Sequence, residues 1–101
     1  MFLYKLIASF IVMTKQNMLN KLIGQFPNSK IEVVDITGQS NHFSLFILSK
    51  VFKPISLIDR HKLIYSVFKK ELTNEIHALE IKAFTPDEWK RKNNKNTPNK
   101  Y

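Results

Sequence analysis

The amino-acid sequence predicts one small domain that combines helices and strands, an α/β fold of the α+β kind. A chain of 101 residues has room for one hydrophobic core and not for two. A hydrophobic fraction of 44% with eight Phe and only two Gly is typical of a globular domain and excludes a disordered chain. Segments with helical and strand-like patterns follow one another in the order α-β-β-α-β-α.

The first half of the chain is predicted to form a helix and then a β-hairpin. Apolar side chains recur every three or four residues from 14 to 26, and Pro27-Asn28-Ser29 ends this amphipathic pattern. Residues 31–36 and 43–49 are β-branched or apolar runs of strand length. Residues 37–41 between them have turn chemistry, so we expect a hairpin with a polar loop.

The second half predicts a helix, a strand and a last short helix. Ser56-Leu57-Ile58-Asp59 has the form of a capping box, which marks the start of a helix that should run to about Leu72. The expected apolar stripe of this helix consists of Leu57, Ile64, Val67, Phe68 and Leu72. Residues 78–84 alternate between apolar and charged, as in a strand with one exposed face. Thr85 then serves as a helix cap before Pro86, and Trp89 anchors the final helix to the domain.

Positive charge is concentrated at the two ends of the chain. The formal net charge is +8, but residues 31–89 carry seven basic and eight acidic side chains. Residues 1–30 and 90–101 carry the remaining basic side chains and no acid. We therefore predict a domain at residues 14–89 that is close to neutral, followed by a disordered basic tail at residues 90–101.

Residues 1–13 form an apolar extension that is too short to span a bilayer as a helix. Three interpretations compete: the hydrophobic part of a secretory signal, an extra helical turn, or residues upstream of the working start. The segment Met13-Thr14-Lys15-Gln16 lacks the small residues of a signal cleavage site. We therefore favour Met13 as the working start, and we expect a cytoplasmic protein that does not bind membranes.

The residue types present argue against an enzyme. The sequence has no Cys, which excludes disulfides, a thiolate nucleophile and metal sites built from this chain's own sulfur. No glycine-rich phosphate loop is present, and no Ser lies beside a recognisable base and orienting acid. The neighbouring carboxylates of Asp87 and Glu88 are explained by helix capping.

Three motifs in order give the chain a marked resemblance to the BolA-like family. They are SNHF at residues 40–43, SLIDRHKLIY at residues 56–65 and IHALEIKAFTPDEW at residues 76–89. With the leading helix and first strand, the similarity covers about three quarters of the chain. The resemblance implies a fold like the class II KH domain, with a three-stranded sheet and helices packed on one face.

The resemblance also implies two classes of function. Family members pair with monothiol glutaredoxins, and the heterodimer can hold a bridging two-iron two-sulfur cluster. Other members are described as transcriptional regulators that affect cell shape and stress response. We therefore expect an adaptor in iron-sulfur cluster assembly, trafficking or iron regulation. In the absence of its partner, this chain is expected to be a monomer without a cofactor. The alternative is a DNA-binding transcriptional regulator.

Two histidines are candidate cluster ligands by resemblance. His77 matches the family's ligand histidine, and a neutral imidazole can replace thiolate on one iron of such a cluster. His42 lies where family members often place a second metal contact. The alternatives are that His77 only caps the strand that begins at Ala78, and that His42 only packs beside Phe43.

Arg60, His61 and Lys62 match the basic segment that family members carry in the central helix. This segment is a candidate surface for glutaredoxin or, in the DNA-binding alternative, for phosphate groups. We expect Arg60 to take part in this surface and Lys62 to be solvated, whereas His61 can belong either to the surface or to the apolar edge of the helix. The clamping GXXG loop of KH domains is missing, because Gly24 and Gly38 are far apart. Phe46 and Leu48 are expected in the core and not in base stacking.

Overall fold

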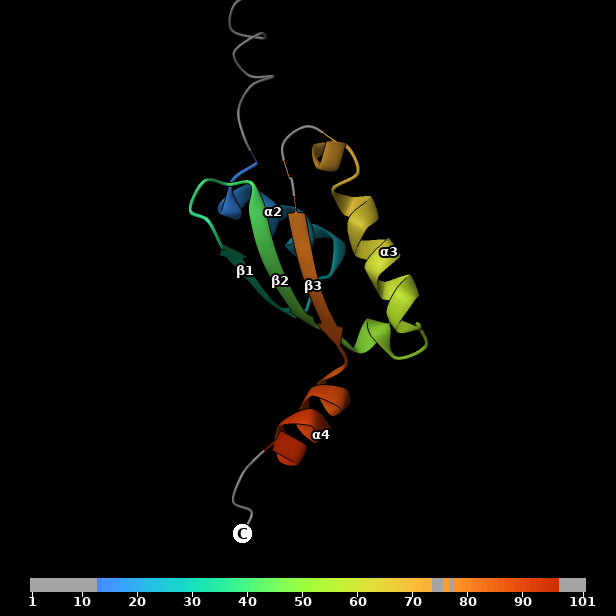
Figure 1. Cartoon of the computed structure of the whole chain (residues 1–101). Helices are drawn as coiled ribbons and strands as arrows, with labels where there is room; N and C mark the ends of the chain where they lie inside the picture. Colours follow the sequence, from blue (N-terminus) through green and yellow to red (C-terminus); the bar gives the residue numbers. More distant parts are fainter. Residues whose placement is uncertain (1–12, 74–75, 77, 97–101) are drawn as a thin grey trace, which may run out of the picture.

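The computed structural model describes residues 13–73, 76 and 78–96, whose arrangement is drawn in Figure 1. The elements are α2 (Lys15–Gln25), β1 (Lys30–Asp35), β2 (His42–Leu48), the 3₁₀ turn η1 (Lys50–Phe52), α3 (Leu57–Val67), the 3₁₀ turn η2 (Glu71–Thr73), β3 (Ala78–Phe84) and α4 (Pro86–Asn96). The predicted order of helices and strands is confirmed. Residues 1–12, 74–75 and 97–101 lie outside the described residues, as does His77, so the predictions for the apolar extension and for His77 fall outside the part that the structure describes.

The three strands form one sheet in the order β1-β2-β3. The hairpin strand β1 is antiparallel to β2, whereas β3 is parallel to β2 because α3 carries the chain back to the starting end of the sheet. On β2 the side chains of Phe43, Leu45 and Ile47 are fully buried, and they alternate with half-buried neighbours. One face of the sheet therefore forms the core.

Helices α2 and α3 cover this core face, as the sequence predicts (Figure 1). Helix α2 begins at a cap where the Thr14 hydroxyl accepts from the Asn17 N–H at 3.1 Å. Its buried side chains, Met18 and Leu22, are four residues apart and thus lie on one side of the helix. The core cluster joins them to Ile64 of α3.

Helix α3 begins as expected but ends earlier, and one of its predicted core positions is wrong. The Ser56 hydroxyl accepts from the Asp59 N–H at 3.2 Å, and the helix ends at Val67. Leu72 lies in η2, where it is half-buried against the core. Leu57 is 62% exposed, because the buried side of the helix is formed by Arg60 and Ile64. Apolar periodicity cannot locate a buried side chain that is charged.

The last helix, α4, differs from the expected short helix and disordered tail, because it continues to Asn96. Its anchor is Trp89, whose ring centroid lies 4.8 Å from that of Phe46 and 5.4 Å from that of Phe84. Phe46 lies on the side of β2 opposite to Phe43 and Leu45. Trp89 therefore packs on the open face of the sheet, which α2 and α3 leave uncovered.

Candidate functional site

The starting ends of β2 and β3 lie together at one edge of the sheet. His42 opens β2 and is paired in register with Ala78, the first residue of β3. The Ala78 N–H donates to the Asn41 carbonyl at 3.2 Å, which extends the pairing by one step into the hairpin loop. The His42 side chain is 34% exposed. The imidazole is thus partly accessible to solvent at this end of the sheet, as a ligand side chain has to be.

The loop before His42 is held by one carboxylate. Asp35 accepts from the Gly38 N–H at 3.0 Å and from the Ser40 N–H at 3.0 Å. The backbone is left-handed at Gly38 (φ 76°) and at Ser40 (φ 57°), which turns both N–H groups toward the carboxylate. The Thr37 hydroxyl donates to the Asn41 side-chain oxygen at 2.7 Å. These bonds fix the direction from which the chain enters β2 at His42.

Among the described residues, Glu80 of β3 is the acidic side chain that pairs with His42. The His42 Nε2 and a Glu80 carboxylate oxygen are 3.3 Å apart, an ion pair when the imidazole is protonated. Within the described residues, no group of three or more His, Asp or Glu side chains could hold a metal ion. At this end of the sheet the described residues therefore supply one imidazole, that of His42, and a metal centre here would depend on further ligands.

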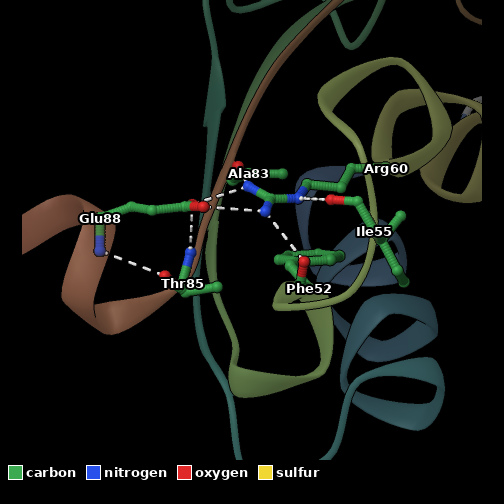
Figure 2. A network of polar contacts seen from close by, with 6 residues as sticks. All are labelled: Phe52, Ile55, Arg60, Ala83, Thr85 and Glu88. Carbon is green, nitrogen blue, oxygen red and sulfur yellow. Dashed lines mark hydrogen bonds and ion pairs between the residues drawn. The ribbon is translucent and has the colours of Figure 1, made fainter.

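Arg60, predicted to form part of a partner surface, is instead buried and only 3% exposed (Figure 2). Its guanidinium donates to three backbone carbonyls, those of Phe52, Ile55 and Ala83, at 2.9, 2.8 and 3.0 Å. It also makes a two-pronged ion pair with Glu88, at 2.7 and 2.9 Å. The prediction for Arg60 is wrong, because a planar group with five N–H donors is satisfied inside the fold.

The Glu88 carboxylate serves two partners at once. It accepts from Arg60, and it also accepts from the Thr85 N–H at 2.9 Å, while the Glu88 N–H donates to the Thr85 hydroxyl at 3.1 Å. This is a complete capping box at the start of α4. The hydrogen bond from Arg60, and then that from the Thr85 backbone, lower the pKa of Glu88 from its ordinary 4.5 to about 2.

The other two residues of the predicted basic surface differ from each other. His61 is half-buried on α3, whereas Lys62 is exposed, as expected for a solvated residue. The structure brings together a different set of cations, Lys50 and Lys53 beside η1 and Arg91 of α4. They line a hollow of about 360 Å³ that also includes Thr85 and Asp87.

Sequence reasoning missed this hollow and the role of Glu88, because both depend on where α4 packs. The aromatic contacts of Phe46 were missed for a different reason. Phe46 and Leu48 were expected in the core, but they are out of phase with Phe43 on a strand whose side chains alternate, and both are half-buried on the other face. That alternation was a signal present in the sequence.

In the part of the chain that the structure describes, no helix has both the length and the apolar character needed to cross a membrane.

Known proteins show the same motifs and the same fold. The family model described as BolA-like protein matches residues 17–88. The DNA-binding transcriptional regulator BolA of Haemophilus influenzae is 45% identical over 56 residues, which cover 55% of this chain and 54% of that protein. The Escherichia coli K12 protein of the same name is 31% identical over 85 residues, which cover 77% of this chain and 81% of that protein.

A solved structure supports the fold independently. The BolA domain of SufE1 from Arabidopsis thaliana superposes with a TM-score of 0.69 at 35% identity, covering 73% of this chain and 93% of that one. The alignment with the Haemophilus relative spans only about half of that protein's length. With the family model matching most of the chain and the α-β-β-α-β-α architecture confirmed, this protein belongs to the BolA-like family.

Proposed function

We propose that this chain is an adaptor without catalysis of its own, which binds a monothiol glutaredoxin and shares a bridging two-iron two-sulfur cluster with it. His77 is the main ligand from this chain and His42 the second, while the partner supplies the thiolates that a chain without Cys lacks. The cluster is present only in the heterodimer, and the isolated chain is a monomer. The proposal rests on family membership and on the position of His42.

One structural observation supports the proposal most directly. His42 is accessible at the end of the sheet, and its paired residue, Ala78, directly follows His77 in the sequence. In the sequence, His77 is therefore the residue immediately before the strand whose first residue pairs with His42. The Asp35 carboxylate fixes the loop that leads into this end of β2, so the imidazole of His42 is offered from a defined backbone.

Glu80 provides the kind of outer partner that ligand histidines use. A carboxylate near one ring nitrogen favours a proton on that nitrogen and leaves the lone pair of the other one available. The Glu80 carboxylate is 3.3 Å from the Nε2 of His42, so Nδ1 is the nitrogen that it leaves free for a ligand bond.

The test is anaerobic reconstitution of the cluster with a monothiol glutaredoxin, followed by visible absorption and circular dichroism. Mixing the wild-type chain with the glutaredoxin should change the spectrum, and His77→Ala should abolish the change. His42→Ala should reduce it, whereas His61→Ala, the third histidine and the matched control on α3, should leave it intact. A wild-type chain that neither binds the glutaredoxin nor perturbs its cluster overturns the proposal.

A second candidate function is the binding of duplex DNA, and a specific observation favours it. Lys90, Arg91 and Lys92 lie on helix α4, and Arg91 lines one hollow with Lys50 and Lys53. Arg60 is buried, so phosphate contacts would come from these three cations and not from the centre of α3. Two relatives carry the name of DNA-binding transcriptional regulators.

The DNA-binding candidate predicts a steep dependence on salt, because phosphate contacts release counterions. Titration of the full chain with duplex DNA at two salt concentrations should show this dependence, and Lys53→Glu should weaken binding. The exposed Lys62 on α3 is the matched control, since Lys62→Glu makes the same change of charge away from the hollow. Equal losses for both variants would mean non-specific attraction to net charge and would remove this candidate.

A further inference from the structure

We propose that the open face of the sheet binds a segment of single-stranded nucleic acid, whose bases stack on an aromatic platform and whose phosphates contact lysines around it. The platform is defined by Phe46, Phe84 and Trp89. It lies on the face opposite to the helical layer and at the far end of the sheet from His42. The inference does not depend on the cluster-sharing proposal or on the duplex-binding hollow.

The geometry of the platform joins three separate elements of the chain. Phe46 comes from the middle of β2, Phe84 from the end of β3, and Trp89 from the first turns of α4. The Phe46 and Phe84 ring centroids are 6.3 Å apart, and Trp89 meets Phe46 edge-on at 68°. All three side chains are half-buried, so part of each ring system remains open to solvent. Such open aromatic surface on a sheet is the feature on which single-stranded bases stack.

A hollow of about 290 Å³ adjoins the platform and has lysines on both sides. Its walls include Phe46 and Trp89, with Lys30 and Glu32 from β1 and Lys82 from β3, so two cations and one acid line it. Lys82 is exposed and forms no ion pair with any described residue, while the contact between Lys30 and Glu32 is long, at 4.0 Å. The hollow is thus both aromatic and able to attract phosphate.

Helix α4 adds positive charge directly next to the platform. Lys90, Arg91 and Lys92 follow Trp89 and are all exposed. Glu88, the nearest acid on the helix, is already neutralised by Arg60. Backbone phosphates that leave the platform toward α4 would therefore meet Lys90, Arg91 and Lys92 over the next turn, an electrostatic arrangement that suits a polyanion.

The same features favour a single strand over a duplex. In a duplex the base faces are stacked on one another and are not available to protein side chains without unstacking. The exposed base of a single strand can place its face on Trp89 without that cost. The absence of a GXXG loop in this sequence bears only on the KH manner of binding and not on a sheet-face platform.

Trp89 is the single Trp of the chain, so its fluorescence reports on the platform alone. The experiment titrates the full-length chain with short oligo(dT), oligo(rU) and a duplex of equal length, at low and moderate salt. Single strands should quench the Trp89 emission, with the duplex giving much less quenching at equal concentration. Quenching by oligo(rU) but not oligo(dT) assigns the site to RNA, the converse assigns it to DNA, and quenching by both assigns it to either.

Two variants test the site itself by the anisotropy of a labelled oligonucleotide. Trp89→Leu should weaken single-strand binding by about 5- to 100-fold, the range for loss of a stacking aromatic. Lys82→Gln should lower the slope of log affinity against log salt by about 0.7, the value for one phosphate contact on a single strand. Lys15→Gln removes the same charge from an exposed position on α2, in the helical layer on the other side of the sheet, and should leave the single-strand slope unchanged.

The proposal is overturned if single strands leave the Trp89 emission unchanged. It is equally overturned if duplex DNA competes on equal terms, or if Lys15→Gln alters single-strand binding as much as Lys82→Gln does. Because Lys82 is exposed on the strand, its replacement tests the site even if Trp89→Leu disturbs the packing of α4.

Discussion

Arg60 and Glu88 join α3 to α4 through a two-pronged ion pair, with Nη1–Oε1 at 2.7 Å and Nη2–Oε2 at 2.9 Å. The pair lies at the end of β3, where the buried guanidinium of Arg60 also donates to the Ala83 carbonyl. Because Glu88 also completes the capping box of α4, one carboxylate both compensates a buried charge and starts the basic helix. The orientation of α4 therefore depends on a residue of α3.

Replacing Arg60 should strongly destabilise the domain. Arg60→Ala leaves the Glu88 carboxylate and three backbone carbonyls without their donor, and we expect a loss of about 3–5 kcal/mol in the free energy of unfolding. Arg60→Lys keeps the charge but not the five-donor fork, so its loss should be smaller. Urea unfolding at neutral pH measures both. Lys62 is exposed on the same helix, so Lys62→Ala should change the free energy of unfolding by less than about 0.5 kcal/mol. A change as small for Arg60→Ala would contradict the stabilising role of the hydrogen bonds that Arg60 makes.

The Glu88 pair should make stability depend on pH in the acid range. The pKa of Glu88 is lowered to about 2 in the folded protein, so the unfolded chain binds the proton at a higher pH than the folded one. The stabilising contribution of Glu88 is therefore complete above about pH 5 and is lost as the pH falls through about 2. Urea unfolding of wild type and Glu88→Gln from pH 6 to pH 2 should show a difference that shrinks with acidity. A difference that stays constant over this range would argue against the assigned pKa.

Thr85 should contribute as the cap of α4. Thr85→Ala removes the hydroxyl that accepts from the Glu88 N–H, and we expect a loss of about 1 kcal/mol with weaker helical circular dichroism. Thr85→Ser retains the hydroxyl and is the matched control. If the two variants unfold at the same urea concentration, the hydroxyl does not act as a cap.

Asp35 should govern the order of the loop that leads to His42. Asp35→Ala removes the acceptor of the Gly38 and Ser40 N–H groups, and we expect a loss of about 1–3 kcal/mol. Amide hydrogen exchange at Gly38 and Ser40 should become faster than at the strand positions of β2. Glu32→Ala, which removes an exposed carboxylate from the same strand, should leave these two amides protected as in wild type.

Much of the fold could be predicted from the sequence because local signals and burial agree along most of the chain. Ser56 and Thr85 cap helices where the sequence places them, and the alternation of residues 78–84 gives a strand with Leu79 and Ala83 buried. The position of His42 at the loop end also follows from the sequence, since the turn residues before it define where β2 starts.

The sequence by itself determined the order of the elements, the family and the two histidine candidates, because these depend on local pattern and motif. Only the tertiary structure decided the fate of Arg60, the reach of α4 and the face on which Trp89 packs. A charged side chain in a helix has the same local pattern whether it is solvated or buried. Its environment depends on carbonyls and a carboxylate up to 28 residues away, which only the folded chain brings within hydrogen-bond distance.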